Sequence, residues 1–314
     1  MKMNIRTVVG LLLGMTLVAA SMMPAQAQPT PPPRPLSLNT PTGLPVLPIM
    51  EGSYDNEDGS FTVSFGYHNR NTDQTLDIPI GPNNFLEPEQ FNGMQPTHFA
   101  TGRSVGVFTV TVPASMRDQS IWWNIKTGNG EMLRVPGRIG RLGYTLDKKP
   151  RPAGTVAPLV GFTANGPRGQ DPMGIIADAP LTVAAGSPLT LTVHAEDISV
   201  RDTTDPRYVE PVPVMVTWQA HQGAAANVTF TRHESTPAPT TPVEGARRPR
   251  GAQANDPNQV RLPLGHGVAS VVATFSVPGE YIIRAAVTNH DAADSSYGDQ
   301  CCWTNAYHKV TVTP

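Results

Sequence analysis

The fold of this chain is decided by residues 61–68, which read FTVSFGYH. Its large apolar side chains occupy every second position, the period of a β-strand with one buried face. Residues 105–112 are mostly β-branched or aromatic and predict a more fully buried strand. Residues 121–125 predict another, and Thr127-Gly128-Asn129-Gly130 behind it suits a hairpin turn. Shorter strands are expected at residues 134–135 and 144–146. The first half of the chain is therefore predicted to be all-β.

The second half repeats this pattern with different residues. Alternating or β-branched runs predict strands at residues 189–194, 214–218, 228–230, 268–275, 281–288 and 309–312. Short strands separated by turn residues are typical of a β-sandwich, and Trp218 is expected between its two sheets. The chain's 33 prolines, 28 glycines and 15% charged residues argue against helical bundles. The predicted fold class is all-β, with two Ig-like β-sandwich domains after a Pro-rich leader.

The predicted organisation has four parts. They are a signal peptide at residues 1–27, a Pro-rich leader at 28–50, an N-terminal β domain at 51–150 and a C-terminal Ig-like β-sandwich at 151–314. The leader contains eight prolines, so little regular structure is expected there. A long loop is expected at residues 233–262. Because it carries a cluster of arginines at 247, 248 and 250, it is either a low-complexity insertion or a basic arm for an acidic partner.

Three stretches of the second half carry a family resemblance. They read VTWQ at residues 216–219, ATFSVPGEY at 273–281 and RAAVTN at 284–289. They resemble the bacterial immunoglobulin-like and PKD-like sandwich modules of secreted proteins, which implies a fold and not a function. GYHNRN at residues 66–71 and GMQPT at 93–97 resemble a unit of uncharacterised secreted bacterial proteins, which implies no activity.

The N-terminus has the pattern of an export signal. Lys2 and Arg6 precede an apolar stretch at residues 8–20, and Ala25-Gln26-Ala27 fits a signal peptidase. We expect cleavage before Gln28. The alternative is a membrane anchor, but the apolar stretch is shorter than the roughly 20 residues that span a bilayer. No later segment is apolar enough to be a transmembrane segment, so the expected location is a bacterial periplasm or the cell exterior.

The charge balance excludes some partners. The formal net charge is −2 for 314 residues, and cleavage after residue 27 removes Lys2 and Arg6, giving −4 for 314 − 27 = 287 residues. Such a balance favours neither nucleic acid nor an anionic membrane as a partner. An unidentified protein or glycan is the expected partner.

Catalytic and metal-binding motifs are weak. Gly102-Arg103-Ser104-Val105-Gly106 fits the G-x-S-x-G elbow, but that motif needs a strand-to-helix turn and strand-forming residues follow it here. No catalytic residue is assigned, and the protein is expected not to be an enzyme. Asp55, Glu57 and Asp58 offer oxygen ligands for calcium, although Asp58-Gly59 fits a hairpin turn better. No zinc-type spacing occurs, so no cofactor is expected.

The chain's two cysteines are adjacent in Cys301-Cys302-Trp303. In an oxidising compartment they can close a vicinal disulfide, bond other chains or stay reduced. As thiolates they can also hold a soft metal together with His290 and His308. A turn signal just before them favours the vicinal disulfide. So short a loop gains little from unfolded-state entropy, so its expected role is to fix local shape.

Aromatic residues are the remaining candidates for binding. They are Trp122, Trp123, Trp303 and Tyr307. Adjacent strand residues face opposite sides, so Trp122 and Trp123 cannot both be buried on the same face. We expect a secreted, non-catalytic binding or extracellular structural protein. The alternatives are a carbohydrate-binding module and an accessory subunit of an exported enzyme.

Overall fold

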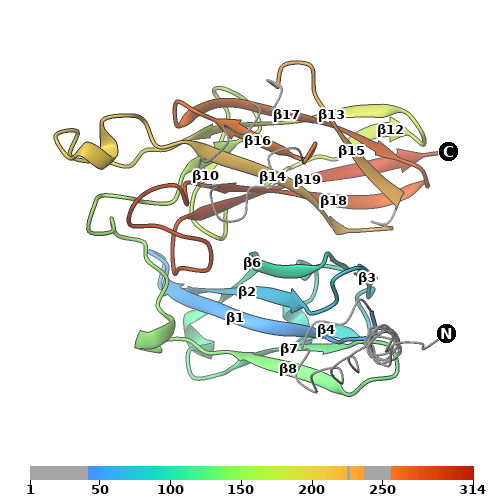
Figure 1. The fold of residues 1–314 in the computed structure, drawn as a ribbon. Coiled ribbons are helices and arrows are strands. Elements are labelled where there is room, and N and C mark those ends of the chain that lie inside the picture. Colours follow the sequence, from blue (N-terminus) through green and yellow to red (C-terminus); the bar gives the residue numbers. More distant parts are fainter. Residues whose placement is uncertain (1–41, 225–226, 237–255) are drawn as a thin grey trace, which may run out of the picture. The chain divides into compact units, whose positions relative to one another are not determined.

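The computed structural model describes residues 42–224, 227–236 and 256–314, and these belong to one compact unit. Their regular structure consists of strands and single 3₁₀ turns arranged as two β-sandwiches (Figure 1). The predicted all-β fold class is thereby confirmed. No helix in the described part of the chain is both long and apolar enough to cross a membrane.

The first sandwich contains two three-stranded antiparallel sheets. One has the order β1 (Val46–Asp55), β2 (Phe61–Asn69) and β6 (Gly102–Val112), and the other β4 (Asn84–Glu87), β7 (Ile121–Lys126) and β8 (Met132–Gly137). A two-stranded sheet pairs β3 (Leu76–Asp77) with β5 (His98–Phe99). The 3₁₀ turns are η2 (Glu89–Phe91), η3 (Ala114–Met116) and η4 (Leu142–Tyr144).

Aromatic rings fill the core of the first sandwich. Phe65 of β2 stacks on Phe108 of β6 with ring centroids 5.2 Å apart, and Phe108 meets Trp123 of β7 edge to face at 4.9 Å. Such pairs add roughly 0.5–1.5 kcal/mol to the burial of their area. The Trp123 indole N–H donates to Asn84 Oδ1 at 3.0 Å, so its polar atom is satisfied inside the core. The alternation read from residues 61–68 places the expected face inward, but the prediction of a half-buried strand is wrong, because Thr62 and Ser64 on the other face of β2 are also buried.

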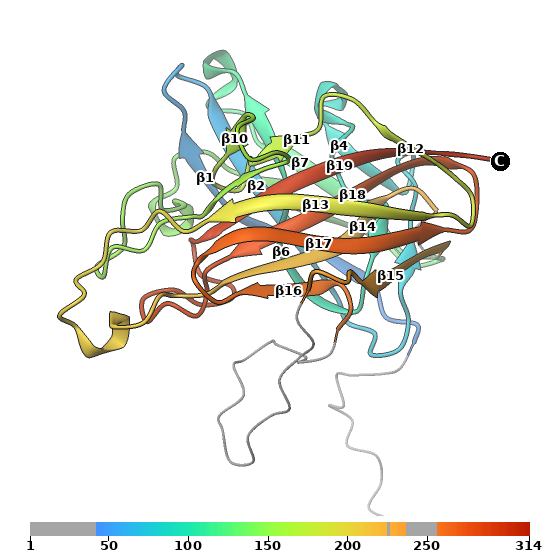
Figure 2. The same ribbon diagram turned by 90° about the horizontal axis from the view of Figure 1, so that it is seen from above.

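The second sandwich stacks a five-stranded sheet on a six-stranded one (Figures 1 and 2). The five-stranded sheet has the order β10 (Arg168–Gly169), β9 (Leu159–Gly161), β13 (Pro188–Glu196), β17 (His266–Phe275) and β15 (Val228–Arg232). The other has the order β11 (Ile175–Ile176), β19 (Trp303–Thr313), β18 (Gly279–Thr288), β14 (Val214–Gln222) and β16 (Gln259–Leu262), with β12 (Leu181–Ala184) parallel to β19. The turn η5 spans Pro206–Tyr208.

Trp218 lies at the centre of this second core, as the sequence predicted. Its side chain is fully buried, among apolar residues such as Leu191 of one sheet and Ile283 of the other. Burying a side chain of this size contributes several kcal/mol at about 25 cal/mol per Å² of apolar area. The strand order of the two sheets is that of an Ig-like sandwich, with the last strand, β19, inside the six-stranded sheet.

Two strands begin where the sequence indicated irregular structure. β1 starts at Val46, inside the expected leader, and it accommodates Pro48 because it is an edge strand that pairs only with β2. β16 lies inside the loop expected at residues 233–262, where its pairing with β14 overrides the weak local pattern. Residues 237–255 of that loop lie outside the described residues, as do the signal peptide and residues 28–41 of the leader.

The strand expected at residues 144–146 is wrong. Residues 142–144 form the turn η4, and a single bridge joins Thr145 to Ser53. Residues 141–145 are all exposed, so no buried face stabilises a longer strand. The two hairpin turns are confirmed, at Asp58-Gly59 and at residues 127–130, where Gly59 and Gly128 adopt φ of +82° and +53°.

Candidate functional site

The outer face of the six-stranded sheet is bonded to the first sandwich. Successive residues of β19 face opposite sides, so Ala306 enters the core while its neighbours point outward. Asn305 Nδ2 donates to the Gly106 carbonyl at 2.8 Å, and Tyr307 Oη donates to the Val107 carbonyl at 2.8 Å. Both acceptors belong to β6. Side chains of one sandwich therefore bind the backbone of the other.

A bulge in β6 makes these carbonyls available. The register with β2 shifts between Phe65 and Tyr67, so β6 has extra residues opposite Gly66. Gly106 lies in the bulge with φ of +52°, and a Cβ there would overlap the Trp303 indole. Backbone conformation and close approach both require glycine at this position.

A buried carboxylate supports the bulge from within. Glu51 accepts from Arg103 Nη2 at 2.7 and 2.6 Å and from the Gly106 N–H at 3.2 Å. Burial raises the pKa of Glu51, and the hydrogen bond and charge of Arg103 oppose that rise. A Cβ on Gly66 would overlap the Glu51 carboxylate, so this glycine leaves the space that the carboxylate of this ion pair occupies.

Arg284 of β18 is the cation that joins the two sandwiches. It is 3% exposed and donates to Gln219 Oε1 at 2.6 Å. It also approaches the Val105 and Gly106 carbonyls at 3.5 and 3.4 Å. Neutral oxygens therefore provide the direct contacts of this buried guanidinium, while Glu51 attracts it at longer range.

The serine of the G-x-S-x-G match lies at this same interface. Ser104 is inside strand β6, is 6% exposed, and its hydroxyl lies 3.5 Å from Arg284 Nη2. A nucleophile elbow exposes its serine on a strand-to-helix turn. Ser104 has neither that backbone nor that exposure. It is a structural residue of the strand, as the strand-forming residues that follow it in the sequence indicated.

A second contact joins β14 to the loop that contains GMQPT. His221 Nε2 lies 2.7 Å from the Met94 carbonyl, which assigns the ring proton to Nε2. Gln222 Nε2 donates to the Gly93 and Gln95 carbonyls at 2.7 and 2.8 Å. Burial lowers the pKa of His221 to about 3, and the charge of Arg284 acts in the same direction. His221 is therefore neutral in the folded protein.

Acid should destabilise the protein through its buried histidines. Burial lowers the pKa of His221 to about 3 and those of His290 and His308 to about 4, from 6.5. The unfolded chain binds more protons below pH 6.5, so stability is lost as pH falls towards 4, by up to about 1.4 kcal/mol per pH unit for each histidine. Glu51 and Asp171, whose pKa values burial raises, act in the opposite direction.

Urea unfolding at pH 7, 6 and 5 measures this effect. His221→Gln keeps a donor for Met94 and should remove about a third of the slope contributed by the three histidines. Equal stability at pH 7 and pH 5 would contradict the burial of these rings as neutral groups.

The loop between β18 and β19, residues 289–302, binds the linker between the sandwiches, residues 145–158. The Asp147 N–H donates to the Gln300 carbonyl at 2.9 Å, and Arg151 Nη1 donates to Asp299 at 3.1 Å. The Ala153 N–H donates to a carboxylate of the same loop, Asp294, at 2.8 Å. The β18–β19 loop thereby fixes the course of the linker.

The same loop also reaches the first sandwich. Gln300 Nε2 donates to the Gly143 carbonyl at 2.9 Å, and Tyr297 Oη donates to the Arg103 carbonyl. Arg103 is the residue that binds Glu51, so this contact lies next to the buried ion pair. The loop therefore adds to the interface that β18 and β19 form.

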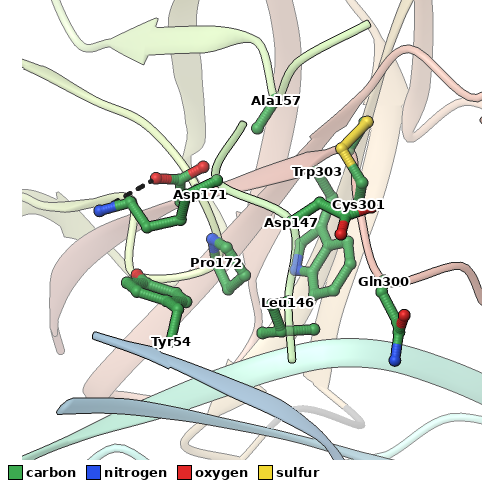
Figure 3. Close-up of a pocket in the computed structure, with 11 residues that line it drawn as sticks. Tyr54, Leu146, Asp147, Ala157, Asp171, Pro172, Gln300, Cys301 and Trp303 are labelled. Atoms are coloured by element: carbon green, nitrogen blue, oxygen red, sulfur yellow. Dashed lines mark ion pairs between the residues drawn. A yellow bond between two sulfur atoms is a disulfide. The ribbon is translucent and has the colours of Figure 1, made fainter. Parts of the chain in front are cut away.

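Cys301 and Cys302 form a vicinal disulfide at the end of this loop. They are 4% and 0% exposed and line a small cavity of about 10 Å³, together with Tyr54, Leu146, Asp147, Lys148, Ala157, Asp171, Pro172, Gln300 and Trp303. Figure 3 shows Tyr54, Asp171 and Trp303 around it, with the ion pair of Lys148 and Asp171 at 3.7 Å. Binding pockets for small molecules usually hold about 300–1,000 Å³. The disulfide is thus a buried element between the sandwiches and not an exposed apolar surface.

The aromatic candidates lie in different places. Trp123, Trp303 and Tyr307 are 0%, 3% and 2% exposed, so none of them offers a free ring face. Trp122 is partly exposed on the outer face of the β4-β7-β8 sheet, where the Arg134 guanidinium lies 4.0 Å from its ring centroid. The structure does not bring the four rings together as one binding surface.

The calcium candidates lie on the turn between β1 and β2. Asp58 Oδ1 accepts from the Ser60 N–H at 3.0 Å and from its hydroxyl at 2.6 Å, and that hydroxyl bond lowers the pKa of Asp58. Asp55 and Glu57 are exposed. Within the part of the chain that the structure describes, no three acidic, histidine or cysteine side chains are grouped as a metal site. Asp58 acts here as a turn residue.

Comparisons with known proteins give little similarity. No protein-family model matches the chain, and no curated protein matches its sequence. The D00-D0 domain of intimin is 12% identical with a TM-score of 0.24, covering 86% of this chain and 100% of its own. A CARDB domain from Pyrococcus furiosus is 12% identical with a TM-score of 0.22, over 44% and 91%. Domains 4 and 5 of the S-layer protein SbsC are 10% identical with a TM-score of 0.22, over 86% and 98%. TM-scores this low do not support a fold assignment, so the assignment rests on the strands and their pairing in this chain.

Proposed function

We propose that this is an exported, non-catalytic protein of binding or extracellular structure, in which two β-sandwiches act as one rigid unit. The observation that carries the proposal is the pair of bonds from Asn305 and Tyr307 of β19 to the backbone of β6. Side chains that bind fixed backbone atoms hold two sheets in one relative position. A unit held in this way presents its loops to a partner without an ordering cost on binding.

Export is tested by fractionating cells that express the full chain. We expect a mature protein that begins at Gln28 and is found outside the cytoplasm, because residues 1–27 have the pattern of a signal peptide. A cytoplasmic chain that keeps these residues would contradict the proposal. The proposal that the protein is non-catalytic would be wrong if the protein hydrolyses an ester and Ser104→Ala abolishes that turnover.

One observation favours carbohydrate as the second candidate ligand. Trp122 is partly exposed on an open sheet face, and polar groups surround it: Arg134 pairs with Glu87 at 3.1 Å, and Asn124 Nδ2 lies 3.3 Å from the same carboxylate. An indole next to hydrogen-bonding groups fits the apolar face and the hydroxyls of a sugar ring. Arg134 covers the indole here, so a sugar would have to displace it.

Replacing Trp122 tests this alternative. Trp122→Ala should weaken the binding of any glycan found in an array screen by tenfold or more, as for an aromatic at the centre of a binding site. Trp122→Phe is the matched control and should retain most of the affinity. Binding to proteins alone, with no glycan bound by the wild type, would rule out the carbohydrate alternative.

A further inference from the structure

The vicinal disulfide lies between two sets of contacts that join the sandwiches. On one side Gln300 accepts from the Asp147 N–H at 2.9 Å and donates to the Gly143 carbonyl at 2.9 Å. On the other side Thr304 Oγ1 donates to the Pro158 carbonyl at 2.6 Å, and Asn305 bonds to β6. The backbone of Cys301 and Cys302 connects these anchors, so its conformation sets their relative position.

We propose that Cys301 and Cys302 form a redox-sensitive clasp that controls how tightly the β18–β19 loop holds the linker and the first sandwich. While the sulfurs are bonded, the covalent ring restricts the backbone between Gln300 and Trp303. Reduction opens the ring and restores torsional freedom to both residues, so holding Gln300 on its partners then costs more conformational entropy. The loop loosens while the core of each sandwich stays folded. This proposal goes beyond the binding or structural role, and it is tested without a ligand.

The reaction is a thiol–disulfide exchange with an external dithiol. A thiolate of the dithiol attacks one sulfur of the pair, the Cys301–Cys302 bond breaks, and a mixed disulfide forms with the other cysteine as the leaving thiolate. The second thiol of the dithiol, as its thiolate, displaces the remaining cysteine. Two electrons and two protons pass to the protein, giving two thiols, and the dithiol becomes a disulfide.

Burial couples this reaction to the docking of the loop. Cys301 and Cys302 are 4% and 0% exposed, so a dithiol reaches a sulfur only when the loop opens. Linkage is reciprocal: if reduction loosens the loop, then loosening the loop must favour reduction. The contacts of Tyr297 and Gln300 with the first sandwich are therefore expected to protect the disulfide.

The rate of reduction by dithiothreitol tests whether the loop must open before a sulfur can be reached. Tyr297→Phe/Gln300→Ala removes two hydrogen bonds from the loop and leaves both cysteines in place. We expect its disulfide to be reduced about tenfold faster than that of the wild type, as measured by thiol alkylation and intact mass. Gln119→Ala, at an exposed glutamine, is the control and should react at the wild-type rate.

Hydrogen exchange of the full chain tests whether reduction loosens the loop. On reduction, exchange should accelerate about tenfold or more at residues 143–147 and 297–300, while the amides of β2 and β14 keep their protection. The Cys301→Ser/Cys302→Ser variant should resemble the reduced protein, and if it does not fold, reduced wild type serves alone. Equal exchange in both redox states, or equal reduction rates in the loop variant and the control, would overturn the proposal.

Discussion

Arg284→Met is expected to lower the free energy of unfolding by about 3 kcal/mol. The methionine keeps most of the buried stem but removes the donors to Gln219 and to the β6 carbonyls. Hydrogen bonds from a charged group contribute roughly 1.5–3 kcal/mol, and a buried acceptor left without a donor costs about 1–3 kcal/mol. Glu51 also loses the attraction of this cation. Urea unfolding followed by circular dichroism gives the value.

The matched control for this variant is Arg138→Met. Arg138 is exposed, and it forms no ion pair within the described part of the chain. Its replacement should change stability by less than about 0.5 kcal/mol. If Arg284→Met is as stable as Arg138→Met, the buried guanidinium does not join the sandwiches.

Gly106→Ala is the second change with a large expected effect, again about 3 kcal/mol. Its φ of +52° is unfavourable for alanine, which costs roughly 1–2 kcal/mol. The added Cβ would overlap the Trp303 indole, and such overpacking typically costs another 1–3 kcal/mol. The bulge must then shift, which also moves the carbonyl that accepts from Asn305. Thermal unfolding of the variant measures the loss.

Gly143→Ala provides the control for the glycine prediction. A Cβ at Gly143 would meet no atom within 4 Å, and its φ is outside the positive range. This variant should be as stable as the wild type within a few tenths of a kcal/mol. A Gly106→Ala protein of wild-type stability would contradict the close approach of β6 and β19.

Periodicity located the longer strands but not how far they are buried, since both faces of β2 are covered. The alternation at residues 61–68 and the β-branched run at 105–112 correspond to β2 and β6, and Trp218 is in the core as expected. Short strands carry too little pattern, which is why β4 was not predicted although Asn84 supports the core tryptophan Trp123. Residues 144–146 resembled a strand in composition, but Tyr144 and Thr145 are exposed and only Leu146 is buried, so no strand forms.

The interface between the sandwiches could not be predicted from the chain. Arg284 and Asn305 are polar residues at outward positions of strands, where solvent is the ordinary neighbour. A sequence signal exists for Arg284, since this large polar group interrupts the apolar or small residues at 281–288. These side chains bind carbonyls of β6, which a bulge in that strand makes available. The bulge arises from strand pairing, so the composition of the chain does not reveal it.

The cysteine pair and the aromatic candidates show the same limit. Their chemistry was clear from sequence, but burial was not: Trp303 and Tyr307 face β6 and not solvent. Trp122 and Trp123 do lie on opposite faces of β7, as alternation requires. Period-two reasoning says which residues share a face, and tertiary packing decides which faces are covered.

We infer that the interface and the β18–β19 loop make the two sandwiches one cooperative unit. Hydrogen exchange along a urea titration tests it, with peptides from β2 reporting on the first sandwich and peptides from β14 on the second. We expect both sets of peptides to lose protection in one transition, with the same midpoint and the same urea dependence. Two transitions with separate midpoints in the oxidised wild type would contradict the claim.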